Sequence, residues 1–340
     1  MSAPRAGTVR IGTRGSALAV AQTRQVADAL AKASGLEVEL VTITTHGDTA
    51  RESLSQLGGT GVFTGALRDA LLNGEIDVAV HSLKDLPTAP HPDIALAAVP
   101  KRADARDVLC ARDGLTLQTL PEGARVGTGS PRRIAQLLAA RPDLQVVDIR
   151  GNIDTRLGRV FDETDDERRL DAIVLAAAGL DRLGRADSAS QRLELSEWPT
   201  APGQGALALE TRREKDASAD GRALAKGLAS VNHVTTRANV AAERAVLAGL
   251  EAGCAAPLAA TALVEDGLLF VTATVYKPDG TEHLTSSHAA SLEGSGQSAL
   301  LEAAADAAQR VVEELLDAGA AELAPLGRQP GAQQPGGAVR

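Results

Sequence analysis

The chain has 340 residues, of which 44% are hydrophobic and 23% charged, so it is long enough for two or three domains with sizeable cores. These fractions exclude a globally disordered chain. A formal charge of −9 and only five aromatic residues argue against a protein that binds nucleic acid through its phosphates or by stacking bases. We therefore expect no nucleic-acid partner.

Two cysteines, Cys110 and Cys254, are too few for a disulfide framework in a chain of this length. They also lack a neighbouring His pattern, so we expect no zinc site and no other bound metal. No apolar stretch is long enough to span a bilayer, and the N-terminal residues run directly into a predicted strand. These features predict a cytoplasmic protein without a membrane partner.

Short apolar runs and helical patterns alternate along the first two thirds of the chain, which is typical of an α/β fold. Helical periodicity is clearest at residues 17–32, 63–72 and 131–140, and Ser16 and Gly35 are suited to cap the first of these helices. The predicted strands are residues 8–11, 37–43, 76–80, 94–99, 108–111, 125–127, 145–149 and 172–176.

The pattern changes after about residue 225, where strands are grouped before a final helix. This grouping predicts a smaller α+β domain at the C-terminal end. A Gly-, Pro- and Gln-rich stretch at 328–340 predicts a disordered tail. The predicted elements are a helix at 236–250, strands at 260–264, 268–276 and 282–289, and a long helix at 296–318.

Small and polar residues collect directly after several predicted strands. In open α/β sheets such loops meet at the carboxyl ends of the strands, so we expect them to form one cleft. In residues 127–133, Ser130 is suited to the N-cap and Pro131 to the first helical position. The following Arg132 and Arg133 would make this helix start an anion site. An ordinary capped helix with solvent-facing arginines is the alternative.

Arginines recur in these loops, and a set of planar guanidinium groups suits a ligand with several carboxylates. Acidic residues are almost as frequent in the same region. The alternative is therefore that these arginines are solvated on the surface and bind no ligand. The adjacent Lys84 and Asp85 follow an apolar run and could form an acid–base and charge-stabilising pair. A surface dipeptide would look the same. The arginines concerned are Arg14, Arg132, Arg133, Arg150, Arg156 and Arg182.

The two cysteines lie in different settings. Cys254 stands in a loop of small residues, where a thiol could be accessible, although a small buried side chain is the usual fate of a lone cysteine. Cys110 fits that buried role. The residues alone thus indicate an anion-binding, two-lobed α/β protein. They leave open a non-catalytic carrier of a polyanion, or a transferase that binds phosphorylated substrates at residues 127–133.

Six motifs, found in order between about residues 8 and 320, strongly resemble the porphobilinogen deaminase family, also called hydroxymethylbilane synthases. They are IGTRGS at 11–16, AVHSLKDLP at 79–87, GTGSPRR at 127–133, IRGNIDTR at 149–156, PGQGA at 202–206 and EAGC at 251–254.

The resemblance implies a transferase of tetrapyrrole biosynthesis. Four porphobilinogen molecules would be joined head to tail with release of ammonia, and water would then release hydroxymethylbilane for the next enzyme of the pathway. The chain would grow on one dipyrromethane cofactor per chain, attached through a thioether to Cys254, because a thiolate is a suitable partner for an electrophilic azafulvene. The family also suggests a monomer.

Site residues are carried over position by position. Asp85 matches the catalytic carboxylate, which would stabilise pyrrolic cations and assist proton transfer. The cofactor would be held by Ser82, Lys84, Asp85, Thr128, Ser130, Arg132, Arg133 and Arg150. The substrate and the growing chain would contact Arg14, Ser16, Gln22, Arg150, Arg156, Arg182 and Gln204.

The implied fold has two lobes like those of periplasmic binding proteins and a smaller α+β domain that carries the cysteine. We expect a discontinuous first domain at 1–103 and 201–226, a second at 104–200, a third at 227–325 and a tail at 326–340. The sequence departs from the family at Gln56, Thr60 and His46, where basic residues are common. We therefore expect the loop at 47–60 to neutralise fewer carboxylates.

Overall fold

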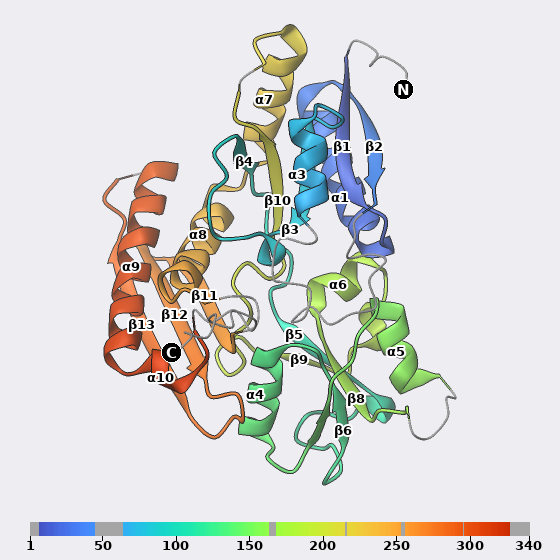
Figure 1. The fold of residues 1–340 in the computed structure, drawn as a ribbon, viewed down its shortest axis with the longest axis vertical. Helices are drawn as coiled ribbons and strands as arrows, with labels where there is room; N and C mark the ends of the chain where they lie inside the picture. The colour runs from blue at the N-terminus through green and yellow to red at the C-terminus, as the bar shows by residue number, and fades with distance from the viewer. Residues whose placement is uncertain are drawn as a thin grey trace, which may run out of the picture.

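The computed structural model describes residues 7–44, 64–162, 168–214, 216–252, 256–294 and 296–326, and within them the chain forms three β-sheets (Figure 1). The first sheet has the order β2 (Glu37–Ile43), β1 (Thr8–Arg14), β3 (Val78–Ser82), β10 (Leu207–Arg212) and β4 (Ile94–Ala98). The second has the order β7 (Gln145–Val147), β6 (Arg125–Gly127), β8 (Ala172–Ala176), β5 (Asp107–Ala111) and β9 (Gln191–Leu193).

The two five-stranded sheets share one topology. In each, three strands run parallel, and the fourth strand in the sheet order is antiparallel to both its neighbours. These antiparallel strands, β10 and β5, each follow a segment that passes from one lobe to the other. We call residues 99–106 the first crossover and residues 194–206 the second crossover. Two α/β lobes joined by two crossovers confirm the predicted fold class.

Helices cover the two sheets of the lobes. The first lobe carries α1 (Ala17–Ser34), α3 (Gly65–Leu72) and α7 (Ala219–Val231). The second carries α4 (Pro131–Ala140), α5 (Ile153–Phe161) and α6 (Ala177–Arg182). The predicted caps of α1 are confirmed, because Ser16 Oγ accepts from the amide of Ala19 at 3.3 Å and Gly35 has a φ of 74°.

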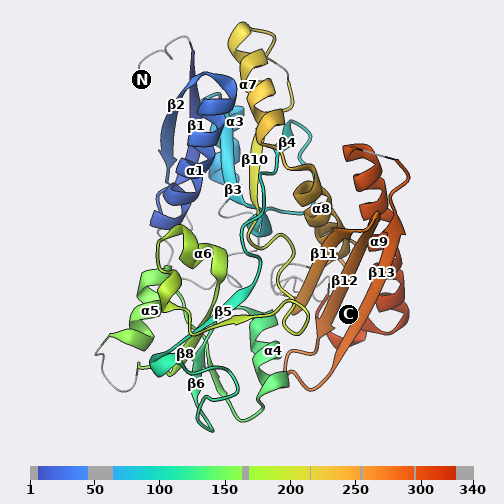
Figure 2. The same cartoon turned by 180° about the vertical axis from the view of Figure 1, so that it is seen from behind.

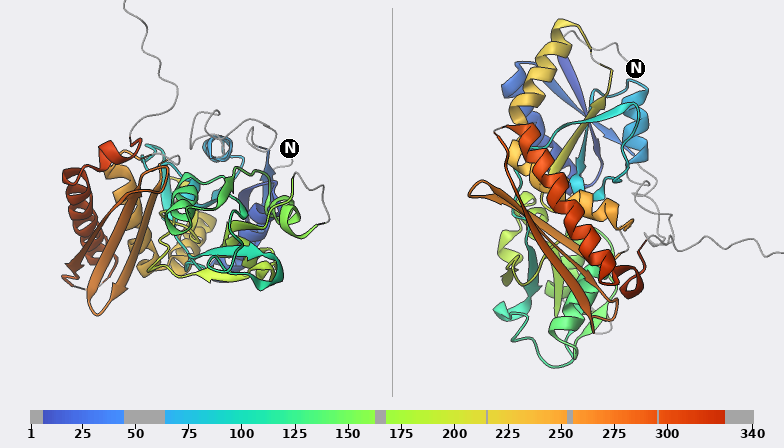
Figure 3. Two further views of the ribbon diagram at one scale, coloured as in Figure 1. Left: turned by 90° about the horizontal axis from the view of Figure 1, so that it is seen from below. Right: turned by 90° about the vertical axis from the view of Figure 1, so that its left-hand side faces the viewer.

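The third unit is a three-stranded antiparallel sheet of β11 (Leu258–Glu265), β12 (Leu268–Tyr276) and β13 (His283–Ser291). The helices α8 (Val234–Gly249) and α9 (Gln297–Asp317) pack against one another and on this sheet, while α10 (Ala320–Leu323) follows α9 (Figure 3). Their shared core is built mainly of alanine, with leucine and valine. This arrangement confirms the predicted smaller α+β domain.

The structure differs from the sequence prediction in two strands and in one domain boundary. The strands β9 and β10 were not predicted: β9 has three residues, and the buried start of β10 lacks the alternation that would mark it as a strand. The expected domain boundary after residue 226 falls inside α7, where a Cβ on Gly227 would lie 2.8 Å from Ser34 Cβ of α1. We propose that the first lobe extends to the end of α7 and that the third unit begins at residue 232.

Several sequence predictions concern residues outside the described part of the chain. These are the departures at His46, Gln56 and Thr60 in the loop at 47–60, the thioether cysteine Cys254, and the tail from residue 327 onward.

Gly205 of the second crossover allows a close approach of two backbone segments. Its φ is +83°, and a Cβ there would lie 2.9 Å from the carbonyl oxygen of Ala103 and 3.0 Å from that of Asp104. We expect Gly205→Ala to lower the free energy of unfolding by about 2–4 kcal/mol, from left-handed strain plus overpacking. Chemical denaturation measures this loss. Gly74→Ala is the control, because Gly74 has a φ of +72° and open space around it. Equal losses in both variants would contradict the close approach.

Candidate functional site

The short helix η1 (Leu83–Asp85) presents the Lys84–Asp85 pair at the carboxyl end of β3. Its position is fixed from two sides. The amide of Leu83 donates to the carbonyl of Ala206 in the second crossover at 3.0 Å. The guanidinium of Arg244, on α8, donates to the carbonyl of Leu83 at 3.2 Å. The pair is therefore held by the second crossover and by the third unit as well as by its own strand.

Lys84 is a half-buried cation beside other cations. In the described part of the chain no carboxylate lies within ion-pair distance of its ammonium. Burial lowers the pKa of Lys84, and the charges of Arg133 and Arg132 lower it further, whereas the exposed carboxylate of Asp85 opposes them. An anionic ligand would relieve this unfavourable position.

A fully buried carboxylate organises the start of α4. Asp107 is 0% exposed, its Oδ1 accepts from Arg133 Nη2 at 2.7 Å, and its Oδ2 accepts from Arg132 Nη2 at 2.9 Å. Trp198 Nε1 and Gln204 Nε2 also donate to it, at 3.1 Å and 2.8 Å. Burial alone would raise the pKa of Asp107, but the charges of Arg132 and Arg133 hold this pKa well below its usual range.

Arg132 and Arg133 are only 3% and 7% exposed. The alternative of an ordinary capped helix with solvent-facing arginines is therefore wrong. Arg132 Nη1 donates to Gln136 Oε1 at 2.6 Å, and Arg133 Nη1 donates to the carbonyl of Val174 at 3.0 Å. Two guanidiniums against one carboxylate leave this cluster with one net positive charge. Among the described residues, Arg132 Nε is a buried donor without a hydrogen-bond partner.

The helix start itself agrees with the sequence prediction in part. Ser130 has the extended backbone of an N-cap and Pro131 opens α4, but the Ser130 side chain makes no capping hydrogen bond. Thr128 Oγ1 accepts from the amide of Ser130 at 3.3 Å instead. The hydroxyl of Ser130 thus remains available to a ligand at the end of β6.

Two further arginines extend the positive field. Arg156, on α5, is half-buried and donates through Nε to the carbonyl of Gly151 at 2.8 Å. Burial lowers the pKa of Arg156, and the charges of Arg133 and Arg150 lower it further. Arg150 is exposed, and its contact with Asp148 is long, at 3.5 Å. The structure thus brings Lys84, Arg133, Arg156 and Arg150 into one electrostatic group.

Polar residues of the first lobe lie at the adjoining strand ends. Gln22 of α1 is buried and accepts from Ser82 Oγ at 3.2 Å, so the starts of α1 and η1 are linked. Ser16 caps α1, and Arg14 is the half-buried last residue of β1. These positions are consistent with the predicted convergence of the strand-end loops.

Gln204 and Arg182 are engaged differently. Gln204 is 1% exposed, and its Nε2 donates to the carbonyl of Ala105 at 2.9 Å as well as to Asp107. It therefore ties the two crossovers together. Arg182 Nη2 donates to the carbonyl of Gly205 at 2.8 Å, and its side chain lines a cavity between α1 and the first crossover.

Sequence reasoning missed a second buried carboxylate, Glu243 of α8. It is 0% exposed and forms a bidentate pair with Arg102 of the first crossover, with N–O distances of 2.6 Å and 3.0 Å. It also accepts from the amides of Gly203 and Ala262 at 2.7 Å and 3.1 Å. One side chain thus joins the third unit to both crossovers. In the sequence, the one feature that could have predicted this buried carboxylate is an acidic residue within a largely apolar helical pattern.

Of the two cysteines, only Cys110 lies in the described part. It is fully buried in β5, and burial raises the pKa of its thiol to about 12. A reactive thiolate is disfavoured there. Among the described helices none has the length and hydropathy of a transmembrane span, and the residues described hold no cluster of three or more potential metal ligands.

Comparisons with known proteins match this chain over most of its length. The family model "Porphobilinogen deaminase, dipyromethane cofactor binding domain" matches residues 9–220, and "Porphobilinogen deaminase, C-terminal domain" matches residues 238–317. The chain belongs to the porphobilinogen deaminase family. It is thus a transferase that condenses porphobilinogen in tetrapyrrole biosynthesis and contains the domain that binds the dipyrromethane cofactor.

Curated relatives named porphobilinogen deaminase agree. The relative from Leifsonia xyli subsp. xyli is 66% identical and covers 95% of this chain and 96% of its own. The relative from Cutibacterium acnes is 50% identical over 94% and 97% of the two chains. Among solved structures, the methionine-binding protein MetQ covers 65% of this chain and 90% of its own, at a TM-score of 0.41 and 14% identity.

We predict that Asp107→Asn lowers the free energy of unfolding at pH 7 by about 3–5 kcal/mol, because it leaves two buried guanidiniums without a carboxylate. The pKa of Asp107 is lower in the folded than in the unfolded protein. The contribution of Asp107 to the free energy of unfolding is therefore complete above its unfolded-state pKa and is lost as the pH falls below that value. The difference between native and variant protein should therefore narrow below about pH 4. Urea unfolding at several pH values measures it. Asp187→Asn, at an exposed position of the same lobe, is the control and should change stability little.

Proposed function

We propose that this chain catalyses the complete sequence inferred from its motifs. It joins four porphobilinogen molecules head to tail with loss of ammonia at each step, and then hydrolyses the product from the enzyme as hydroxymethylbilane. We further propose that one dipyrromethane per chain is attached through a thioether to Cys254. The observation that carries the proposal is the Lys84–Asp85 pair at a strand end, inside the field of Arg133 and Arg132.

The charges of the site fit a dipyrromethane. Each of its pyrroles bears an acetate and a propionate, so the group is polyanionic. Lys84 has no ion-pair partner among the described residues, and the cluster of Asp107 with two arginines keeps one net positive charge. The buried Nε of Arg132 still lacks an acceptor within the described part of the chain. Added carboxylates would therefore be stabilised here.

Different residues have different tasks toward these carboxylates. Lys84 would bind one directly, and the hydroxyl of Ser130 would donate to another. The hydroxyl of Ser82 donates to Gln22 Oε1, so it would have to turn away from Gln22 to donate to a carboxylate of the cofactor. Because Arg132 and Arg133 are already bonded to Asp107, they would act chiefly as a fixed positive charge with a defined orientation. Thr128 would keep the loop before α4 in shape through its bond to the Ser130 amide.

Asp85 would supply the catalytic carboxylate. It is exposed at the tip of η1, where it can face the N–H groups of bound pyrroles. A carboxylate there stabilises positive charge that develops when ammonia leaves, and it can accept and return a proton. When bound, the dipyrromethane supplies the pyrrole carbon to which the first substrate is joined.

The incoming substrate would be bound from both lobes. We assign this task to Arg150 and Arg156 of the second lobe, which keep guanidinium donors for it, and to Arg14 and Ser16 of the first, with Gln22 orienting Ser82. The substrate would thus be held between the two lobes. We assign Gln204 to the crossovers rather than to the substrate, because its amide is buried and bonded to Ala105 and Asp107.

We also propose that the enzyme is a cytoplasmic monomer, which passes its product to the next enzyme of the pathway. The support for the compartment is that two cysteines are too few for a disulfide framework in a chain of this length. The monomer is what the resemblance to the family suggests.

The attachment site is tested by the mass of the denatured protein. We expect purified protein to exceed its chain mass by two porphobilinogen-derived rings, and Cys254→Ser to lose this excess. Cys110→Ser is the matched control and should keep it, because the buried Cys110 thiol has a raised pKa and is not available as a thiolate. Loss of the excess in Cys110→Ser alone would contradict the assignment.

The role of Asp85 is tested by turnover. Asp85→Asn should keep the cofactor mass and the unfolding midpoint but lose about 10²–10⁴-fold in porphobilinogen consumption, as expected for loss of a general acid–base group. Asp93→Asn, at another exposed position of the same lobe, is the control and should retain activity. Near-normal turnover of Asp85→Asn would show that the Asp85 carboxylate is not needed for catalysis and would contradict its proposed role.

A further inference from the structure

The turn between β12 and β13, residues 277–282, lies beside α4, the helix whose first turn carries Arg132 (Figure 2). The turn approaches this helix at Gly280, whose φ is +75°. A Cβ on Gly280 would lie 2.5 Å from the carbonyl oxygen of Ala135 and 2.7 Å from the amide nitrogen of Ala139. Because only glycine fits such an approach, this position allows the third unit to pack directly on the backbone of α4.

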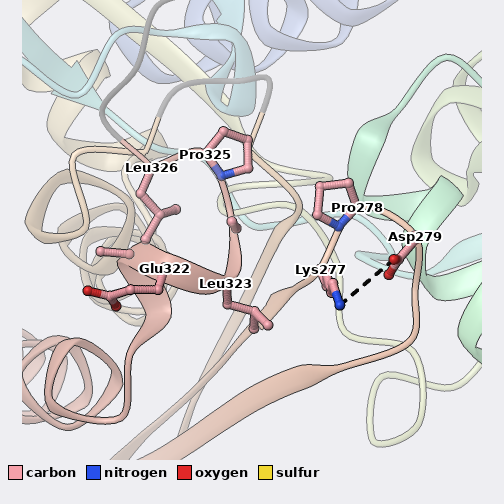
Figure 4. Close-up of a pocket in the computed structure, with 9 residues that line it drawn as sticks. Lys277, Pro278, Asp279, Glu322, Leu323, Pro325 and Leu326 are labelled. Atoms are coloured by element: carbon pink, nitrogen blue, oxygen red, sulfur yellow. Dashed lines mark ion pairs between the residues drawn. The ribbon is translucent and has the colours of Figure 1, made fainter.

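The turn is held in one conformation by its own side chains. Lys277 Nζ lies 2.7 Å from Glu282 Oε1 and 3.9 Å from Asp279 Oδ2. Asp279 Oδ1 accepts from the amide and the hydroxyl of Thr281, at 3.0 Å and 2.7 Å. Figure 4 shows the turn from the side of a cavity of ≈ 560 Å³, where Lys277 and Asp279 lie opposite α10. Because the lysine of that cavity is already paired, we assign the cavity no ligand and regard the turn as a rigid contact on α4.

Tyr276, the last residue of β12, bonds this contact to a side chain of α4. It is 7% exposed and packs with Ala135 of α4 and Ala259 of β11 in a small apolar cluster. Its hydroxyl oxygen accepts from Gln136 Nε2 at 3.2 Å. Burial raises the pKa of Tyr276, so the hydroxyl is neutral at pH 7. The third unit therefore offers α4 a buried, neutral acceptor.

The hydroxyl of Tyr276 helps to determine which way the amide of Gln136 faces. Gln136 Nε2 donates to this hydroxyl and to the carbonyl of Pro199 at 2.8 Å, which uses both of its N–H groups. Gln136 Oε1 accepts from Arg132 Nη1 at 2.6 Å. With both acceptors on the nitrogen side, the amide oxygen is held toward Arg132.

The guanidinium of Arg132 is in turn fixed at its two terminal nitrogens. Nη1 donates to Gln136 and to the carbonyl of Pro199 at 3.2 Å, and Nη2 donates to Asp107. Because the guanidinium is planar, these bonds also fix the direction of Nε–H. Within the described residues this buried Nε has no acceptor. A carboxylate of a bound ligand would satisfy it.

We propose that Tyr276 is a positioning residue for the cofactor site. Through Gln136, its hydroxyl holds the Arg132 guanidinium so that Nε–H is presented to a carboxylate of the bound dipyrromethane. This inference rests on the proposed function, in which Arg132 belongs to the cofactor site. It adds that the third unit, which would carry the cofactor on Cys254, also orients an arginine of the second lobe that receives it.

The first readout is turnover per cofactor-loaded chain. Tyr276→Phe removes the hydroxyl and keeps the ring, so we expect the variant to retain the fold and the two-ring mass. The kcat for porphobilinogen consumption should fall about three- to tenfold, as for loss of one buried hydrogen bond. KM should stay within about twofold, because Arg132 acts on the attached cofactor rather than on the incoming substrate. A merely structural role of Tyr276 would lower stability without lowering kcat per loaded chain.

The second readout does not depend on activity. Solvent exchange of the Arg132 Nε–H is followed by NMR in the native holoprotein, and Arg132→Lys identifies the signal by its loss. Exchange should be about three- to tenfold faster in Tyr276→Phe, because the guanidinium is held less firmly. The control is Thr272→Val, which removes another hydroxyl of β12, bonded to Ser287 of the same sheet. This control should leave the exchange rate and kcat as in the native protein.

A double-variant cycle tests the route through Gln136. Gln136→Met removes the amide, and in that background Tyr276→Phe should change kcat by less than about twofold. The proposal is overturned if Tyr276→Phe leaves the exchange rate or kcat unchanged, if it raises KM instead, or if it lowers kcat equally in the Gln136→Met background. Absence of the two-ring mass from the native protein would instead overturn the proposed function, and with it the role of Tyr276 toward the cofactor.

Discussion

The burial of Asp107 between Arg132 and Arg133 is the interaction on which the remaining site depends. A lone carboxylate or guanidinium in this position would be strongly unfavourable, but two guanidiniums, an indole N–H and an amide N–H satisfy both carboxylate oxygens. Because Asp107 opens β5 and both arginines open α4, the ion cluster fixes the helix start against β5, the antiparallel strand of its sheet. Its net charge of plus one then faces the Lys84 side of the site.

Buried polar bonds also determine how the three units are joined. Gln204 bonds the second crossover to the first, and Glu243 bonds both crossovers to α8 of the third unit. The Lys84–Asp85 helix packs against the same second crossover. Movement of the third unit would therefore either shift the Lys84–Asp85 helix with it or break the buried ion pair Arg102–Glu243, which costs about 3–5 kcal/mol.

The positive charge of the site is divided between fixed and available groups. Arg132 and Arg133 are immobilised by internal bonds, so they contribute field and orientation without losing freedom when a ligand binds. Lys84, Arg150 and Arg156 keep donors for direct contact. This division suits an anionic chain that changes length during the reaction. Contacts with Lys84, Arg150 and Arg156 can be exchanged as the chain grows, while the positive field of Arg132 and Arg133 stays constant.

Local sequence patterns by themselves determined most strands, the capped start of α1, the Ser130–Pro131 start of α4 and the motifs that indicated the family. They did so because strand alternation, helix caps and strand-end loops depend on residues only a few positions apart. Only the tertiary structure decided that Arg132 and Arg133 are buried on Asp107, that β10 returns to the first sheet, and that Glu243 pairs with Arg102. These outcomes join residues that are distant in the chain, and no short-range pattern distinguishes a buried ion-pair partner from a solvated one.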